Sequence, residues 1–358
     1  MSAVETKDLR PGHRISRVIK GGWQLAGDHG SVDRKAAISD MEAFVDAGIT
    51  TFDCADIYTG VEEMIGEFIA DLRRRRGAEV ANRVMVHTKL VPDLSHLADL
   101  RADEVEAIID RSLKRLQIEQ LDLVQFYWWD LTLGNAVEGF DVLKDCQKKG
   151  KIANLGVTNW DLEQTARFMD AGFDIAATQV QYSVLDRRPT YGLTDWAKHH
   201  DIQLLCYGTL AGGFLTDKWL GQPDPGFAFE NRSLVKYRLI IDEFGAWEQF
   251  QALLSLLKAI GDRHGVSLSS VATRWVLDQP QVAAAIVGAR YASHLPKTLE
   301  TFEFTLDIED YSEIDALQRQ SKGPAGKVFG LEADWTSRHG SIMKYNLNTR
   351  PQDQVLGR

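Results

Sequence analysis

The chain has 358 residues, of which 44% are hydrophobic and 26% charged, and this length suits either two average domains or one large α/β barrel. Its formal net charge of −10 argues against nucleic acid or an anionic membrane as the main partner. The first residues lack a secretory apolar core, no apolar run reaches the ~20 residues that span a bilayer, and the cysteines suggest no disulfide framework, so we expect a cytoplasmic protein.

Eight short segments with strand character recur along the chain, and they are nearly continuous in apolar residues, as expected for strands buried on both faces. The predicted strands are residues 17–23, 49–54, 84–90, 121–128, 152–157, 175–181, 202–207 and 282–287. Apolar residues recur at three- and four-residue steps in the segments between them, which predicts helices. These segments are residues 35–47, 62–75, 103–116, 137–149, 162–171, 191–200, 244–264 and 267–278.

Strands that alternate with helices indicate parallel strands joined by crossover helices, so the fold class is α/β. Eight such units favour closure into a (β/α)8 TIM barrel, with an open doubly wound sheet as the alternative. No Gly-x-Gly-x-x-Gly opens a helix after the first strand, so the dinucleotide fingerprint of the open sheet is missing. We therefore expect a single domain over residues 1–358, with the barrel at about 15–305 and a C-terminal extension at about 306–358.

Two late segments lack a regular pattern. Residues 216–241 predict a long loop after the seventh strand, and the segment after about residue 321 is irregular and aromatic. Because long loops in compact domains often form lids or pocket walls, we expect these segments to border the site.

Polar side chains occupy the ends of the predicted strands, where barrel proteins gather their chemistry. Asp53 ends the second strand, Tyr58 lies in the loop after it, and Lys89 ends the third. A phenol with a pKa of about 10 is a poor acid near neutrality, but an ammonium group held by a carboxylate lowers that pKa. If the three side chains meet, they can protonate a carbonyl oxygen while another group delivers hydride. Later strand ends carry Tyr127, Thr158, Asn159, Gln179, Tyr207, Gly208 and Gly288.

Several motifs, in this order along the chain, give it a resemblance to the aldo-keto reductases from about residue 21 to residue 301. Residues 51–66 and 121–130 are similar to the first and second signatures of that family. Gly-Val-Thr-Asn at 156–159 is similar to the family's Gly-Val-Ser-Asn. Tyr-Gly-Thr-Leu-Ala-Gly-Gly-Phe-Leu-Thr at 207–216 is similar to its Tyr-Ser-Pro-Leu-x-x-Gly-x-Leu. Gln-Val-Gln-Tyr-Ser at 179–183 and the segment 286–290 have family counterparts as well.

The resemblance implies a set of catalytic roles. Tyr58 would be the general acid for reduction and the base for oxidation, and Lys89, paired with Asp53, would lower its pKa. Tyr127 departs from the family, which usually has histidine there to orient the substrate carbonyl. Tyr127 could replace that donor, the pocket could suit an unusual substrate, or activity could be weak. His87 lies two residues before Lys89 and deeper in the barrel, so we expect it to be a core histidine.

The resemblance also implies a nicotinamide cofactor, with NADP(H) favoured and NAD(H) as the alternative. Arg290 is a candidate partner for a 2′-phosphate, since a guanidinium group binds phosphate in a forked manner. The family pattern differs at residues 294, 297 and 298, where this chain has His294, Lys297 and Thr298. The expected cofactor-binding residues are Gly22, Trp23, Thr158, Asn159, Gln179, Tyr207, Gly208, Leu210, Gly212, Gly288, Arg290, His294 and Thr298.

Aromatic residues near the strand ends, namely Trp23, Trp128, Trp129 and Trp160, are candidates for the substrate pocket, with core packing as the alternative reading. No residues have zinc-ligand spacing, so we expect no metal. We expect an oxidoreductase that interconverts a small aldehyde or ketone, sugar-like or ring-bearing, and its alcohol. The alternatives are a cofactor-sensing regulatory protein with little turnover and an unrelated barrel hydrolase or isomerase. The oligomeric state is left open by the sequence.

Overall fold

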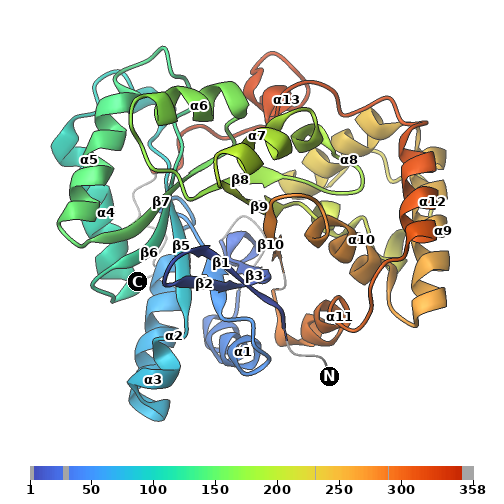
Figure 1. Ribbon diagram of the computed structural model, residues 1–358, viewed down its shortest axis with the longest axis horizontal. Coiled ribbons are helices and arrows are strands. Elements are labelled where there is room, and N and C mark those ends of the chain that lie inside the picture. Colours follow the sequence, from blue (N-terminus) through green and yellow to red (C-terminus); the bar gives the residue numbers. More distant parts are fainter. Residues whose placement is uncertain (1–3, 27–31, 230, 289, 349–358) are drawn as a thin grey trace.

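A computed structural model describes residues 4–26, 32–229, 231–288 and 290–348. Its centre is a closed barrel of eight parallel strands in the order β10-β3-β4-β5-β6-β7-β8-β9 (Figure 1). The strands are β3 (Val18–Gly21), β4 (Thr51–Asp53), β5 (Met85–Leu90), β6 (Leu121–Phe126), β7 (Ile152–Thr158), β8 (Ala177–Gln181), β9 (Gln203–Tyr207) and β10 (Val282–Val287). Each falls on a predicted strand segment, so the predicted (β/α)8 barrel is confirmed.

Helices surround the barrel and cover the outer face of its strands (Figure 1). The α-helices of the described chain are α1 (Arg34–Asp46), α2 (Val61–Arg76), α3 (Ala78–Ala81), α4 (Ala102–Leu116), α5 (Ala136–Lys148), α6 (Leu162–Asp170), α7 (Leu193–His199), α8 (Arg232–Phe244), α9 (Trp247–His264), α10 (Leu268–Leu277), α11 (Leu295–Glu300), α12 (Ile308–Gln318) and α13 (Gly330–Ala333). None of the helices described combines the length and apolarity that crossing a membrane requires.

The prediction of a loop over residues 216–241 is wrong in its second half, because α8 begins at Arg232. Asn231 caps this helix, since its side chain accepts a hydrogen bond from the Ser233 backbone N–H at 2.7 Å. Leu239 and Ile241 then bury one face of the helix. The Pro and Gly residues at 221–226, before the cap, are typical of a loop, and the prediction extended that loop into the helix that follows.

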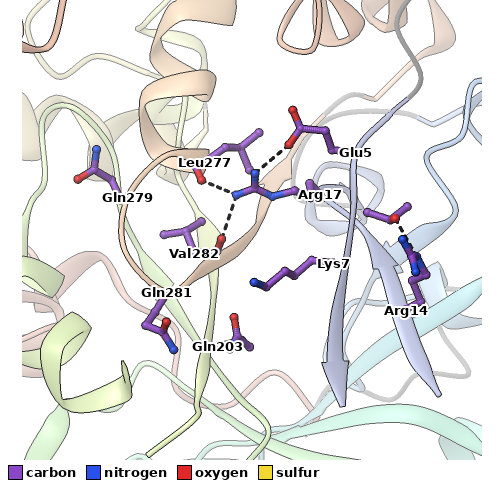
Figure 2. A pocket seen from close by; sticks show the side chains of 10 residues that line it. Glu5, Lys7, Arg14, Arg17, Gln203, Leu277, Gln279, Gln281 and Val282 are labelled. Atoms are coloured by element: carbon purple, nitrogen blue, oxygen red, sulfur yellow. Dashed lines mark hydrogen bonds and ion pairs between the residues drawn. The ribbon is translucent and has the colours of Figure 1, made fainter. Parts of the chain in front are cut away.

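An N-terminal hairpin closes the bottom of the barrel. Strands β1 (Thr6–Arg10) and β2 (His13–Ser16) pair antiparallel, and Leu9 and Ile15 pack with Leu123 and Leu205 in the core inside the barrel. Arg17, just after the hairpin, donates hydrogen bonds to the carbonyl oxygens of Leu277 and Val282 and pairs with Glu5 at 2.9 Å (Figure 2). These contacts hold the hairpin at the amino-terminal ends of the barrel strands. The candidate site lies at the other end, where the strands finish.

A buried histidine pair joins this hairpin to β5. His13 Nε2 and His87 Nε2 are 3.0 Å apart, and the Asn154 amide nitrogen lies 2.8 Å from His13 Nδ1. Because the amide donates to Nδ1, His13 carries its proton on Nε2 and donates it to His87. Both rings are neutral in this arrangement. The prediction that His87 is a core histidine is therefore confirmed.

The histidine pair predicts a loss of stability in mild acid. In an unfolded chain a histidine has a pKa near 6.5, whereas burial lowers the pKa of His13 to about 4 and that of His87 well below its usual value. Between pH 6.5 and 4 the unfolded chain takes up protons that the folded chain does not. The free energy of unfolding therefore falls with pH in this window, by roughly 3 kcal/mol from His13 alone.

Urea unfolding at pH 7 and pH 4.5 measures this loss. The free energy of unfolding should differ clearly less between the two pH values in the double variant His13→Leu/His87→Leu than in the wild type. His199→Gln, a change at an exposed histidine, should keep the full difference. Equal pH dependence in all three proteins would refute the assignment of the effect to the buried pair.

Candidate active site

A buried ion pair lies at the centre of the strand ends. Lys89 Nζ donates to Asp53 Oδ1 at 2.6 Å and to the Cys54 carbonyl oxygen at 2.8 Å, and both charged side chains are only 5% exposed. Burial lowers the pKa of Lys89, but the nearby Asp53 charge outweighs that effect, so this pKa lies above its usual value. Lys89 is therefore a fixed positive charge at the floor of the site.

Two glutamines hold the other oxygen of this carboxylate. Gln179 Nε2 donates to Asp53 Oδ2 at 2.7 Å and Gln125 Nε2 donates to the same oxygen at 3.2 Å. Gln179 also donates to Gln125 Oε1 at 3.0 Å. The sequence reasoning missed Gln125, although a lone glutamine inside the apolar run at 121–128 was a signal. Gln179 was expected to contact a ligand; its nitrogen is engaged with Asp53, and its oxygen remains available.

Tyr58 lies directly above the ion pair. Its ring centroid is 5.0 Å from Lys89 Nζ and 4.9 Å from the Trp23 ring centroid. The sequence predicted a lowered phenol pKa, but burial outweighs the opposing effect of Lys89 and raises the pKa of Tyr58 to about 12. Tyr58 thus keeps its proton at neutral pH. Its hydroxyl donates to no described residue, so the proton is available to a ligand.

Tyr127 follows β6 and reaches the same cavity. Its backbone N–H donates to the Leu90 carbonyl oxygen at 3.0 Å, and its ring packs edge-on against Trp129, with centroids 4.9 Å apart. Burial, with the nearby Tyr345 and Glu332, raises the pKa of Tyr127 above its usual value. Among the described residues its hydroxyl has no hydrogen-bond partner, so it is a neutral donor that faces the cavity.

The cavity measures about 700 Å³ and collects most of the predicted site residues. Its lining includes Trp23, Asp53, Tyr58, Lys89, Tyr127, Trp129, Thr158, Asn159, Gln179, Tyr207, Gly208, Leu210, Gly212, Gly288, His294 and Thr298. Asn159 and Tyr207 are joined, since the Tyr207 hydroxyl donates to Asn159 Oδ1 at 2.8 Å.

Four predicted site residues do not line this cavity. Trp128 and Trp160 were expected in the substrate pocket, but both pack on Phe126 in the layer between barrel and helices, with centroids 5.6 Å apart in each case. Gly22 was expected to contact the cofactor, but its N–H donates to the Asp53 carbonyl oxygen at 2.7 Å. A Cβ at residue 22 would clash with that oxygen. Arg290 lies beside the Tyr291 ring, outside the cavity lining.

The cavity is suited to a long anionic ligand. Cationic side chains line it, and Asp53, already paired with Lys89, is the one carboxylate among its described lining residues. The cations besides Lys89 are Lys218, Arg232, Lys236, Lys297 and Lys344. Gln24 Oε1 is buried in the lining without a described hydrogen-bond partner, as expected for a group that awaits a ligand donor.

The loop after β9 brings backbone into the cavity at two glycines. Gly208 and Gly212 have φ angles of +71° and +64°, which L side chains rarely adopt. A Cβ at either position would come within 2.7 Å of the Tyr237 side chain in α8. The loop therefore requires glycine both for its conformation and for its close approach to α8.

The C-terminal extension forms the outer wall of the cavity. Phe329, Ile342, Met343 and Leu347 contribute apolar side chains to the lining. Asp93 holds this segment, because its Oδ1 accepts from the backbone N–H groups of both Leu347 and Asn348 at 2.8 Å. The prediction that the late segments border the site is therefore confirmed for the tail.

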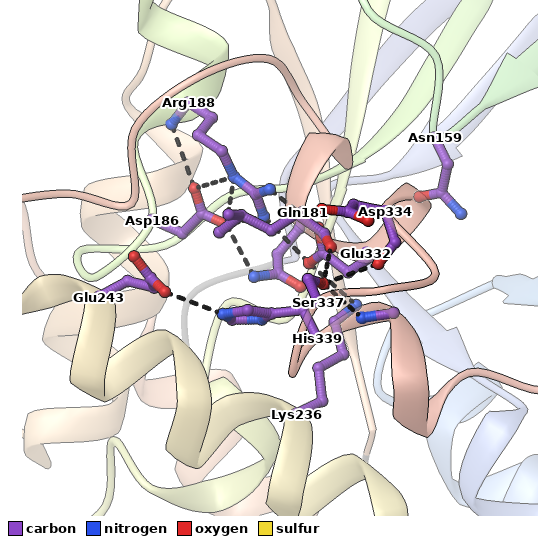
Figure 3. Close-up of polar contacts among 12 residues, drawn as sticks. Asn159, Gln181, Asp186, Arg188, Lys236, Glu243, Glu332, Asp334, Ser337 and His339 are labelled. Carbon is purple, nitrogen blue, oxygen red and sulfur yellow. Dashed lines mark hydrogen bonds and ion pairs between the residues drawn. The ribbon is translucent and has the colours of Figure 1, made fainter.

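A buried ion-pair network anchors the same wall (Figure 3). The Arg188 guanidinium donates to both oxygens of Glu332 at 2.9 and 3.1 Å, and to Asp186 at 2.7 Å. Gln181 Nε2 donates to Asp186 at 2.7 Å. All four side chains are buried, so the network fixes α13 over the ends of the strands.

Comparisons with known proteins agree with this geometry. Residues 17–319 match the model of the aldo/keto reductase family. The chain is 31% identical to aldo-keto reductase YhdN of Bacillus subtilis, over 89% of this chain and 95% of that protein. It is 26% identical to 6-dehydroglucose reductase of Novosphingobium aromaticivorans, over 87% and 95%. The glycerol dehydrogenase AKR11B4 from Gluconobacter oxydans has a similar structure, with a TM-score of 0.73, 27% identity, and coverage of 87% and 94%. The chain therefore belongs to the aldo/keto reductase family of oxidoreductases.

Proposed function

We propose that the protein reduces an aldehyde or ketone to an alcohol with a nicotinamide cofactor, and that Tyr58 donates the proton. The observation that carries the proposal is the protonated Tyr58 hydroxyl, which faces the cavity directly above the Lys89–Asp53 pair. The names of the relatives agree, since 6-dehydroglucose reductase and glycerol dehydrogenase denote carbonyl reduction and alcohol oxidation.

The chemistry of this chain is proton transfer to a carbonyl oxygen. As negative charge develops on that oxygen, the Tyr58 O–H transfers its proton and becomes a phenolate. Lys89, held by Asp53 at 2.6 Å, stabilises the phenolate charge. In the oxidative direction the same phenolate removes the proton of the alcohol.

A bound reduced nicotinamide would supply the hydride for this reaction. The residues that fit such a cofactor are Thr158, Asn159 and the oxygen of Gln179 at the ring end, with the glycine loop after β9 at the phosphates. His294, Lys297 and Thr298 line the far end of the cavity, and Lys297 favours a 2′-phosphate and hence NADP(H). Four other cations of the lining, Lys218, Arg232, Lys297 and Lys344, support a cofactor that carries several negative charges.

Binding and turnover can be tested together. Titration of the protein with NADPH and with NADH, followed by tryptophan fluorescence, should show binding of both and tighter binding of NADPH. A panel of aldehydes and ketones should then give turnover with the preferred cofactor. Tight NADPH binding without turnover on the whole panel would favour a cofactor sensor. Absence of binding would refute both functions.

Tyr127 is proposed as a second hydrogen-bond donor to the carbonyl oxygen. Tyr127→Phe keeps the ring that packs on Trp129 but removes the hydroxyl, so kcat on an aldehyde should fall by on the order of 10²-fold. The dissociation constant of NADPH should stay within about twofold. Steady-state kinetics and fluorescence titration measure the two quantities. Full activity in Tyr127→Phe would show that this hydroxyl is not used.

A further inference from the structure

Lys236 presents its ammonium group to the cavity. It projects from α8, lines the same cavity as Tyr58 and Tyr127, and is only 14% exposed. Its Nζ lies 3.8 Å from Glu332 Oε1, which is too long for a hydrogen bond, and its ammonium hydrogens have no acceptor among the described residues. The ammonium is therefore open to the cavity, where it can donate to an acceptor of a ligand.

Glu332 is not the acceptor of this ammonium, because Arg188 already donates to its carboxylate. Both of its oxygens accept hydrogen bonds from Arg188, at 2.9 and 3.1 Å, and the glutamate is fully buried behind Lys236 (Figure 3). Burial lowers the pKa of Lys236, and the Glu332 charge opposes that shift without using the ammonium hydrogens. Lys236 is thus a charged donor held at the cavity wall.

Aromatic rings fix the position of this ammonium relative to the reacting end. Nζ lies 4.9 Å from the Tyr207 ring centroid and 5.6 Å from that of Phe329, distances that favour cation–π attraction. The Phe329 ring in turn lies 6.1 Å from the Tyr127 ring. Phe329 therefore packs against both Lys236 and the ring that carries the hydroxyl proposed to hold the carbonyl oxygen.

We propose that the substrate carries an anionic oxygen group, such as a carboxylate, several bonds from its reacting carbonyl, and that Lys236 binds this group. This inference rests on the proposed reductase function. An ω-carboxylated aldehyde is a substrate of this kind, whereas an α-keto acid, with adjacent groups, is not.

A matched pair of substrates tests this specificity. 4-Formylbenzoate carries a carboxylate across a ring from its aldehyde, and 4-formylbenzamide is a neutral compound of nearly the same shape. The ratio of their kcat/KM values should fall tenfold or more in Lys236→Met, because a hydrogen bond to a charged group contributes about 1.5–3 kcal/mol. Lys236→Arg should keep most of the ratio, and Lys198→Met, at an exposed lysine, should keep all of it.

The outcomes separate this inference from the reductase proposal. Unchanged turnover of the amide, with selective loss on the carboxylate and an unchanged dissociation constant for NADPH, would support the role of Lys236. Equal losses on both substrates, or a ratio that does not change, would overturn it while leaving the reductase function intact. Weaker NADPH binding with equal losses would place Lys236 on a cofactor phosphate and would also overturn it. If the wild type reduced other aldehydes of the panel but not 4-formylbenzoate, this inference would be overturned; if it bound NADPH but reduced no compound at all, the reductase function itself would fail. Should Lys236→Met not fold, Lys236→Gln replaces it in the same comparison.

Discussion

Tyr58→Phe should lower kcat for aldehyde reduction by on the order of 10³-fold and leave the dissociation constant of NADPH within about twofold. The change removes only the hydroxyl that faces the cavity, and a positioned general acid contributes about 10²–10⁴-fold to rate. The ring remains packed on Trp23 and beside Lys89, so the cavity keeps its shape. Pre-steady-state mixing of enzyme, NADPH and aldehyde measures the chemical step directly.

A matched control for this change is Tyr191→Phe. Tyr191 is 59% exposed and lies outside the cavity lining, so its variant should retain wild-type kinetics. If Tyr58→Phe kept more than about a tenth of wild-type kcat in the chemical step, another group would have to be the proton donor.

The second large effect is expected at Arg188, and it is an effect on stability. Arg188→Met should destabilise the fold by about 3–5 kcal/mol, because it leaves two buried carboxylates, Asp186 and Glu332, without their shared cation. Burial opposes the lowering of the Glu332 pKa, but Arg188 and then Lys236 outweigh it and hold that pKa at about 2. A folded-state pKa below the usual value of 4.5 stabilises the fold fully above pH 4.5, and the contribution is lost as pH falls toward 2.

Chemical denaturation and amide hydrogen exchange read out this prediction. At pH 7 the variant should unfold at lower denaturant concentration, and exchange should quicken first in residues 329–347, which form the cavity wall. The difference in the free energy of unfolding between Arg188→Met and the wild type should become smaller as the pH is lowered below 4.5. Arg187→Met removes a neighbouring guanidinium that donates to the Gln318 carbonyl oxygen, and it should cost much less. Equal stability of Arg188→Met and the wild type would show that the network contributes nothing to the fold.

The barrel and its reacting centre could be predicted because both follow from short sequence patterns, namely apolar runs and the polar residues at their ends. Each strand is a nearly continuous apolar run, and parallel strands bring their carboxyl ends to one edge, which placed Asp53 beside Lys89. The alternation of side chains along a strand could also have excluded Trp128 from the substrate pocket. Tyr127 faces the cavity, so its neighbour Trp128 must point outward into the helical layer, where the structure places it.

The rest of the site depends on contacts between distant segments. Arg188 and Glu332 are 144 residues apart, and only the folded chain shows that they meet or that Lys236 lies beside them. The Tyr58 pKa was predicted in the wrong direction for a related reason. The sequence shows the ammonium that lowers this pKa but not the burial that raises it more.

The most direct test of the account follows a labelled hydrogen. NADPH with deuterium at both C4 positions of the nicotinamide is mixed with the wild-type protein and 4-formylbenzamide, and the alcohol is analysed by mass spectrometry and NMR. Hydride transfer from the nicotinamide should place one deuterium on the former carbonyl carbon, with the hydroxyl proton drawn from Tyr58 and ultimately from solvent. An alcohol without deuterium at that carbon, or NADPH that stays reduced in the presence of every aldehyde and ketone tried, would contradict it.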